Sequence, residues 1–183
     1  MSEKVAIFID GGYLAKICTH KIDFSLLVEK ILDGKSLYRA YYYNCPPYMP
    51  QNPHAEDRER MARAQKFYKS LNFIPRFCVR LGKLRLKGYD KDSGTPLFQQ
   101  KRVDLMLGLD IASVVKAQPR VVDSIILLAG DGDMLPAVVT ARDANHIVIL
   151  AHGDKNTYDQ ELWDSVDERV RLDAAFLKDM AMR

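Results

Sequence analysis

Short apolar runs recur along the chain and alternate with longer segments of mixed polarity. Three of these runs have the length of a single strand: VAIFI (5–9), IILLA (125–129) and the apolar centre of HIVILAHG (146–153). A continuous apolar run of this length is typical of a strand that is buried on both faces. A fourth segment, SLYRAYYYN (36–44), is rich in aromatic residues and also predicts a strand.

Amphipathic segments fill the spaces between these runs and predict helices. We expect helices over residues 25–34, 56–71, 101–117 and 134–145, and one terminal helix over about 160–181. The terminal helix either covers the sheet or makes a homodimer, since apolar residues lie along its length. Four prolines within CPPYMPQNP (45–53) predict an irregular loop.

Buried strands that alternate with helices indicate βαβ units, and therefore an α/β fold with a mostly parallel central sheet. We see no linker and no internal repeat, so we predict a single domain over residues 1–183 with its core at about 4–152. A chain of 183 residues is long enough to bury a substantial core.

The composition narrows the class of protein without naming a function. Hydrophobic residues make up 48% of the chain and charged residues 28%, as in ordinary globular proteins. No apolar run approaches the roughly 20 residues of a membrane span, and the start of the chain lacks the pattern of a secretion signal. We therefore expect a cytoplasmic protein with no membrane partner. The three cysteines form no Cys–His cluster, which argues against a structural zinc site.

Positive charge is concentrated in one segment. Residues 76–91 hold six Lys or Arg against one acid, a local charge of +5, whereas the whole chain carries +3. Leu84 and Leu86 alternate with three of these cations, which predicts a strand with one basic and one apolar face. A basic strand is suited to a polyanion such as nucleic acid. The candidate nucleic-acid contacts are Arg80, Lys83, Arg85, Lys87, Lys101 and Arg102.

Tyrosines near the basic segment suggest contacts with unpaired bases. Tyr41, Tyr42, Tyr43 and Tyr48 could stack on such bases. The alternative is a solvated hairpin beside tyrosines that face the core. Both interpretations remain open at this point.

Carboxylates follow two of the buried strands. Asp10 comes directly after 5–9, and Asp131 and Asp133 come after 125–129. Because ligands bind outside the carboxyl ends of parallel strands, we expect these side chains to meet, with Asp104 added from the first turn of the helix at 101–117. Such a cluster requires a compensating cation, and an oxygen-only ligand set favours Mg²⁺ or Mn²⁺. The predicted chemistry is hydrolysis of phosphodiesters.

Each of these acids also has a simpler interpretation. Asp10 could cap the following helix, Asp131 and Asp133 could cap the helix that begins near Met134, and Asp104 could be an exposed helical charge. Asp110 falls on the apolar face of its helix, so we assign it a structural role or a role in support of the metal ligands.

Other catalytic motifs fit the sequence less well. Gly130 and Gly132 would need a third glycine at position 135 to form a dinucleotide-binding fingerprint, and Leu135 is there instead. The sequence shows no Ser–His–Asp pattern, and the four histidines are scattered.

Three segments resemble the motifs of NYN domains, specifically the LabA-like bacterial group of the PIN-like nuclease superfamily. They are VAIFIDGGYL, KRVDLMLGLDI and ILLAGDGDMLPAV, in the order of that family, and the resemblance covers roughly residues 4–152. It implies a three-layer, Rossmann-like (PIN-like) fold and a metal-dependent ribonuclease, with Asp10, Asp104, Asp131 and Asp133 as metal-binding catalytic residues. Tyr13 stands where many members have asparagine.

Two other functions remain open as alternatives to a ribonuclease. A non-catalytic RNA-binding or adaptor domain can be built on the same fold. The segment LLAGDGDMLPAVVTARDAN also resembles the last motif of haloacid-dehalogenase-like phosphatases, but the second aspartate of that mechanism would fall at Gly12. The resemblance favours RNA over DNA as the partner, whereas the residues alone distinguish neither RNA from DNA nor an endonuclease from an exonuclease.

Overall fold

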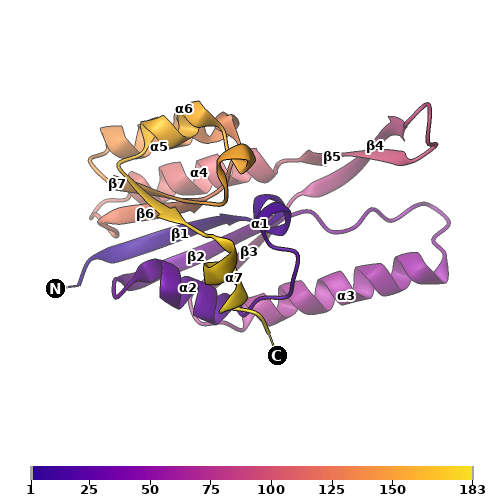
Figure 1. Cartoon of the computed structure of the whole chain (residues 1–183), viewed down its shortest axis with the longest axis horizontal. Helices are drawn as coiled ribbons and strands as arrows, with labels where there is room; N and C mark the ends of the chain where they lie inside the picture. The colour runs from indigo at the N-terminus through magenta and orange to yellow at the C-terminus, as the bar shows by residue number, and fades with distance from the viewer. Residues whose placement is uncertain (1, 183) are drawn as a thin grey trace.

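The four predicted strands and two further strands form a six-stranded sheet in which every strand is parallel to its neighbours (Figure 1). The computed structural model describes residues 2–182. The strands lie in the order β3-β2-β1-β6-β7-β8. Their bounds are β1 Lys4–Asp10, β2 Ser36–Asn44, β3 Phe77–Leu81, β6 Ser124–Leu128, β7 Ile147–His152 and β8 Glu168–Arg171. The predicted α/β fold with a parallel sheet is confirmed.

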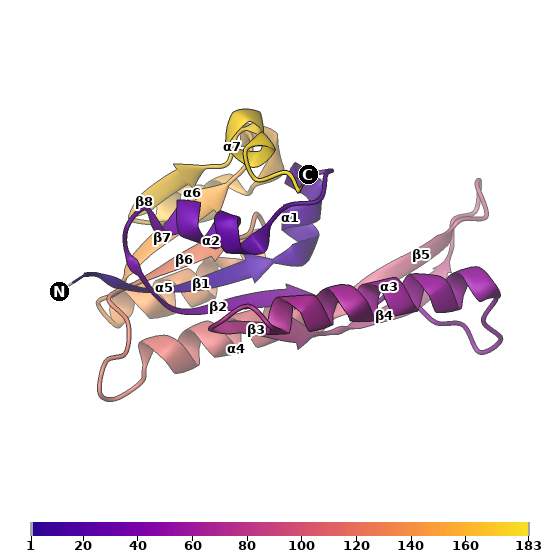
Figure 2. The same cartoon turned by 90° about the horizontal axis from the view of Figure 1, so that it is seen from below.

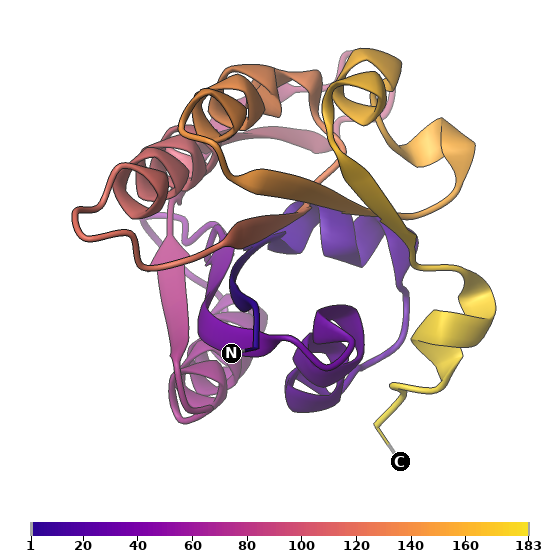
Figure 3. The ribbon, with the colours of Figure 1, turned by 90° about the vertical axis from the view of Figure 1, so that its left-hand side faces the viewer.

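Helices cover both faces of the sheet and make three layers (Figure 3). One face is covered by α4 (Val103–Val115), α5 (Leu135–Asp143) and α6 (Gln160–Ser165). The other is covered by α1 (Gly11–Ile17), α2 (Phe24–Leu32), the end of α3 (Ala55–Asn72) and α7 (Ala174–Lys178). Successive side chains of β1 enter opposite layers: Phe8 packs under α4, whereas Ile7 and Ile9 pack on the α1–α2 side.

The strand order reverses direction between β1 and β6. The chain moves from β1 outward to β2 and β3, then returns to place β6 on the other side of β1. The β1–β6 register pairs Ile9 with Leu128, so the residues that follow both strands emerge at the same edge. A reversal of this kind leaves a crevice at the carboxyl ends of the two strands, which is where open α/β sheets bind ligands.

An antiparallel hairpin, β4 (Lys83–Tyr89) and β5 (Pro96–Lys101), leaves the body beyond this edge. The hairpin and the first half of α3 project side by side from the carboxyl ends of the strands (Figures 1 and 2). We call residues 45–60 and 83–101 the arm. The prolines of 45–53 form the predicted loop within it.

The single terminal helix predicted over 160–181 is wrong. The chain instead forms α6, β8 and α7 there, and β8 pairs with β7 at the sheet edge. The spacing of Leu162, Val166 and Val170 imitates a helix, but hydrogen bonding to β7 determines the outcome. Leu162, Leu172 and Leu177 pack in the core, so this segment covers its own sheet and gives no reason to expect a dimer.

The fold also contains two short 3₁₀ helices, η1 (Gly132–Met134) and η2 (Lys155–Thr157). Across the described residues, 2–182, the helices are too short or too polar to cross a membrane.

Candidate active site

Asp10 ends β1 and lies half-buried at the start of α1. Its Oδ1 accepts hydrogen bonds from the backbone N–H groups of Gly12 (2.8 Å) and Tyr13 (3.2 Å), so Asp10 is also the N-cap of α1. Burial raises the pKa of this carboxyl above its ordinary value, the two backbone bonds oppose that shift, and the charges of Asp104 and Asp131 add to it. The cap therefore fixes one oxygen while neighbouring carboxylates destabilise the charge.

Asp131 and Asp133 stand in the turn after β6. Asp131 Oδ1 accepts from the backbone N–H of Asp133 at 3.0 Å and caps η1. The predicted capping role of Asp131 is therefore present in the structure, as it is for Asp10. Both residues are exposed, and both lie within electrostatic range of Asp104.

Asp104 is exposed in the first turn of α4. It shares with Asp133 a groove of about 320 Å³ between α4 and α5. Partial desolvation of its carboxyl group, then the charges of Asp131 and Asp133, raises the pKa of Asp104 although the residue is exposed. The four predicted carboxylates therefore act on one another across a single crevice at the β1–β6 edge.

These acids do not form a closed cage of ligands. Within residues 2–182 no three His, Cys, Asp or Glu side chains lie close enough together to hold a metal ion. The four carboxylates lie at one edge of the sheet and would have to converge on a cation. Their donor chemistry fits Mg²⁺ or Mn²⁺, because all the available ligands are oxygens and the mutual repulsion requires positive charge.

Two further residues lie beside this crevice and are not among the predicted site residues. A Cβ on Gly132 would lie 3.0 Å from Cγ of Asp159, which also caps α6 through Leu162 N–H. A Cβ on Gly12 would lie 3.3 Å from Nε2 of Gln100 at the end of the hairpin. Asp159 carries a helix-start signal in the sequence, but the proximity of both residues to the site arises from tertiary folding.

Tyr13, the departure from the family motif, is buried beneath the β6 turn. Its ring lies against Gly130, where any Cβ would collide with it. Its hydroxyl accepts from Gly153 N–H at 3.0 Å and pairs with Thr157 Oγ1 at 3.0 Å. Tyr13 therefore joins α1 to the loops after β6 and β7, a task that a shorter asparagine could not perform in the same way.

Asp110 lies apart from the crevice and has a structural role. It accepts from the Tyr43 hydroxyl at 2.8 Å and from Arg80 Nε at 3.0 Å. Burial, then the adjacent Asp110 charge, raises the pKa of Tyr43. The guanidinium of Arg80 also lies 5.9 Å from the centre of the Tyr41 ring, so this predicted nucleic-acid contact is already engaged within the protein.

The tyrosines of β2 face the core. Tyr41, Tyr42 and Tyr43 are 5%, 4% and 0% exposed, so the prediction that they stack on bases is wrong and the alternative is confirmed for them. Consecutive β-strand residues enter opposite layers, and both layers here are covered by helices. Tyr48 differs because it lies in the arm, with its ring 5.2 Å from that of Phe98.

The remaining basic candidates are exposed. Lys83, Arg85 and Lys87 alternate along one face of β4, and Lys83 pairs across the hairpin with Lys101. Arg102 follows as the N-cap position of α4 with a left-handed backbone (φ 77°), two residues before Asp104. Cations therefore extend from the hairpin to the acidic crevice.

Comparison with solved structures supports the fold. The chain matches the crystal structure of VPA0982, a Vibrio parahaemolyticus protein of unknown function, with a TM-score of 0.64 and 21% sequence identity over 96% of each chain. At this identity the match shows the fold alone. No curated protein gives a significant match.

Comparison with family models supplies the family. The NYN domain model matches residues 4–173, which span the sheet, the arm and all four crevice carboxylates. The three motifs found in the sequence lie within this range, and the match extends through β8. The chain belongs to the NYN domain family.

Proposed function

We propose that this NYN domain is a metal-dependent ribonuclease of the LabA-like group that hydrolyses phosphodiester bonds at the β1–β6 crevice. NYN domains are a PIN-like nuclease family, which supports the reaction class. The observation that carries the proposal is the placement of four carboxylates at a reversal of strand order, where desolvation first and the neighbouring acids second raise the pKa values of Asp10 and Asp104. A protein without use for a cation would gain nothing from this repulsion.

Asp10, Asp104, Asp131 and Asp133 would hold Mg²⁺ or Mn²⁺. Such an ion supplies stabilisation of the attacking water and of the leaving oxygen. The capping bonds to Oδ1 of Asp10 and Asp131 fix those carboxylates and leave their second oxygens for ligands. Asp159, beside Gly132, adds a further acid at the same edge.

The cations next to the crevice would bind the substrate backbone. Lys101 and Arg102 are closest along the chain to Asp104, and Lys83, Arg85 and Lys87 continue along the hairpin. We propose RNA as the substrate in preference to DNA and the cytoplasm as the place of action.

The first test is cleavage of a labelled single-stranded RNA of mixed sequence in Mn²⁺, in Mg²⁺ and in EDTA. The Asp10→Asn, Asp131→Asn double variant should lose cleavage but keep its fold, because asparagine also caps helices. Asp33→Asn is the matched control, since Asp33 follows α2 and has a left-handed backbone that asparagine tolerates. Cutting that survives in the double variant would reject this site.

The second candidate is a non-catalytic RNA-binding domain. It is favoured by the helix caps, which alone account for Asp10 and Asp131, and by Tyr13 in place of the family's asparagine. RNA retained in a gel shift without cutting in any metal would support it. A phosphatase of the haloacid-dehalogenase type is disfavoured by the family match and by Gly12.

A further inference from the structure

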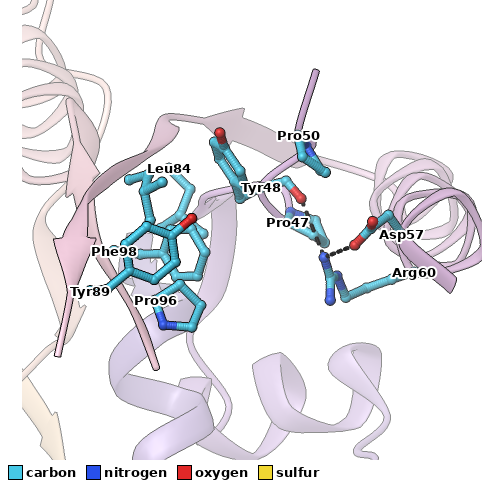
Figure 4. Close-up of a pocket in the computed structure, with 10 residues that line it drawn as sticks. Pro47, Tyr48, Pro50, Asp57, Arg60, Leu84, Tyr89, Pro96 and Phe98 are labelled. Atoms are coloured by element: carbon cyan, nitrogen blue, oxygen red, sulfur yellow. Dashed lines mark hydrogen bonds and ion pairs between the residues drawn. The ribbon is translucent and has the colours of Figure 1, made fainter. Parts of the chain in front are cut away.

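A groove of about 490 Å³ runs through the arm, between the hairpin and α3 (Figure 4). Aromatic and proline side chains dominate its walls, and Arg60 lies on the α3 side, bonded to Asp57 and to the Tyr48 carbonyl. Tyr89 and Phe98 remain 64% and 41% exposed although both line the groove. Large apolar rings left in contact with water are expected at sites where a ligand covers them.

One face of the hairpin runs from the groove towards the proposed active site. The register pairs Leu86 with Phe98 and Leu84 with Gln100, so all four side chains share a face. Leu84, Leu86 and Phe98 line the groove, and the Gln100 amide reaches Gly12 at the cap of Asp10. Phe98 and Gln100 are two strand residues apart, on the order of 7 Å. A chain that occupies the acidic crevice therefore meets the groove next.

The charge of the arm specifies the chemistry of that chain. The whole arm holds seven Lys or Arg against five Asp or Glu, and the excess lies in the hairpin, where residues 83–101 hold five Lys or Arg against two Asp. Lys83, Arg85 and Lys87 lie on the reverse face of the groove wall. These exposed cations can bind the phosphates of a strand that runs along the hairpin. An apolar, aromatic groove within a basic hairpin suits flat bases joined by phosphates.

We propose that this groove binds unpaired bases of the RNA strand whose phosphodiester is cut at the crevice. The inference deepens the proposed ribonuclease function and rests on it. The rings of Tyr48, Phe98 and Tyr89 supply stacking surfaces, which accept any base because every base has a flat face. Bases of a duplex are already stacked and paired, so the arm selects single-stranded segments.

The test measures binding in EDTA, where no cleavage is needed. Single-stranded RNAs carrying 2-aminopurine at successive positions are titrated with wild type, with Phe98→Ala and with Leu97→Ala. Leu97 is the matched control, because it is a 48%-exposed apolar neighbour on the same strand that does not line the groove. We expect stacking to quench fluorescence in wild type and Leu97→Ala, and Phe98→Ala to lose the quench and about fivefold or more in affinity.

Melting temperatures of the three proteins establish that each is folded. Equal affinity of wild type and Phe98→Ala, or equal binding of a duplex of the same sequence, would overturn the proposal. A proline-rich peptide could also be titrated with the same proteins. If Phe98→Ala weakened binding of that peptide and left RNA binding unchanged, the proposal would be overturned in favour of a protein partner. If wild type cleaves RNA and Phe98→Ala cleaves it with the same kinetics, the groove proposal is rejected and the nuclease proposal stands. If Phe98→Ala loses the fluorescence quench but wild type cleaves no RNA, the nuclease proposal is rejected and the groove proposal stands.

Discussion

The sheet edge and the arm differ in what holds them in place. Phe8 and its neighbours in β1 are fully buried between two helical layers, whereas within residues 83–101, all of them described, no residue is fully buried. Burial of apolar surface is the main stabilising contribution to a fold, so the sequence of β1 is constrained by packing. The arm contributes little to that packing. Its alternating cations and exposed rings therefore need another explanation, and a ligand supplies one.

The largest effect on stability should come from shortening a core side chain of β1. Phe8→Ala removes a side chain with no exposure whose ring stacks 5.0 Å from Tyr41, and we expect a loss of about 3–5 kcal/mol in the free energy of unfolding. Phe98→Ala should cost less than about 1 kcal/mol, because its site can relax into solvent. Urea denaturation of both variants measures the contrast. Similar losses would show that the arm is part of the core.

The next effect concerns the buried hydroxyl of Tyr13. Tyr13→Phe keeps the ring against Gly130 but leaves the buried Gly153 N–H without its acceptor. An unsatisfied buried donor costs about 1–3 kcal/mol. Denaturation should show this loss in Tyr13→Phe and little change in Tyr38→Phe, a half-buried tyrosine of β2. No loss in Tyr13→Phe would mean that the loop after β7 adjusts freely.

A substitution in the acidic crevice should increase the free energy of unfolding, unlike the substitutions above. Asp10→Asn removes a desolvated carboxylate from among like charges, so the free energy of unfolding of the metal-free variant should rise by about 0.5–2 kcal/mol, the usual range for a single stabilising substitution. Because the folded pKa of Asp10 is raised, its stabilising contribution is present below the ordinary value of 3.8 and is lost as pH rises through the raised pKa.

Melting curves in EDTA across that pH range measure this effect. The variant should exceed wild type at neutral pH, and the two should converge as the pH falls. Added Mg²⁺ or Mn²⁺ should stabilise wild type and not the variant. A variant that is less stable than wild type at neutral pH would contradict the repulsion argument.

The smallest effect separates two arginines at the base of the arm. Arg85→Ala should weaken RNA binding and reduce the salt dependence of log K by about one phosphate contact. Arg80→Ala should change RNA binding less, because Arg80 is paired with Asp110, and should instead cost up to about 1 kcal/mol of stability. Filter binding at several salt concentrations compares them. Equal salt slopes for both variants would show that Arg80 also contacts the backbone.

The sequence predicted the centre of the fold well because the signal there is strong. VAIFI and IILLA have no polar side chain to place, so burial on both faces is the only economical arrangement. The terminal segment failed for a specific reason. Its apolar residues follow a helical period, but the exposed edge of β7 accepts backbone hydrogen bonds from 168–171, and local periodicity contains no information about that partner.

The candidate site was predicted in part for a similar reason. Asp10, Asp131 and Asp133 follow strands directly, and the rule that parallel strands end together brings them to one edge. Asp159 and Gln100 reach the same edge from the start of α6 and from the hairpin, and only tertiary folding shows this. The sequence left a stacking role open for Tyr41, Tyr42 and Tyr43 because it does not show that helices cover both faces of β2.

The way the hairpin joins the body has a consequence for evolution. Gly82 and Lys101 lie together where the hairpin begins and ends, so close that a Cβ on Gly82 would lie 2.5 Å from the Lys101 carbonyl oxygen. The two ends of the hairpin thus already meet, and its length can change without displacing β3 or α4. Substitutions in this one hairpin can therefore alter what the arm binds without displacing the carboxylates of the proposed active site.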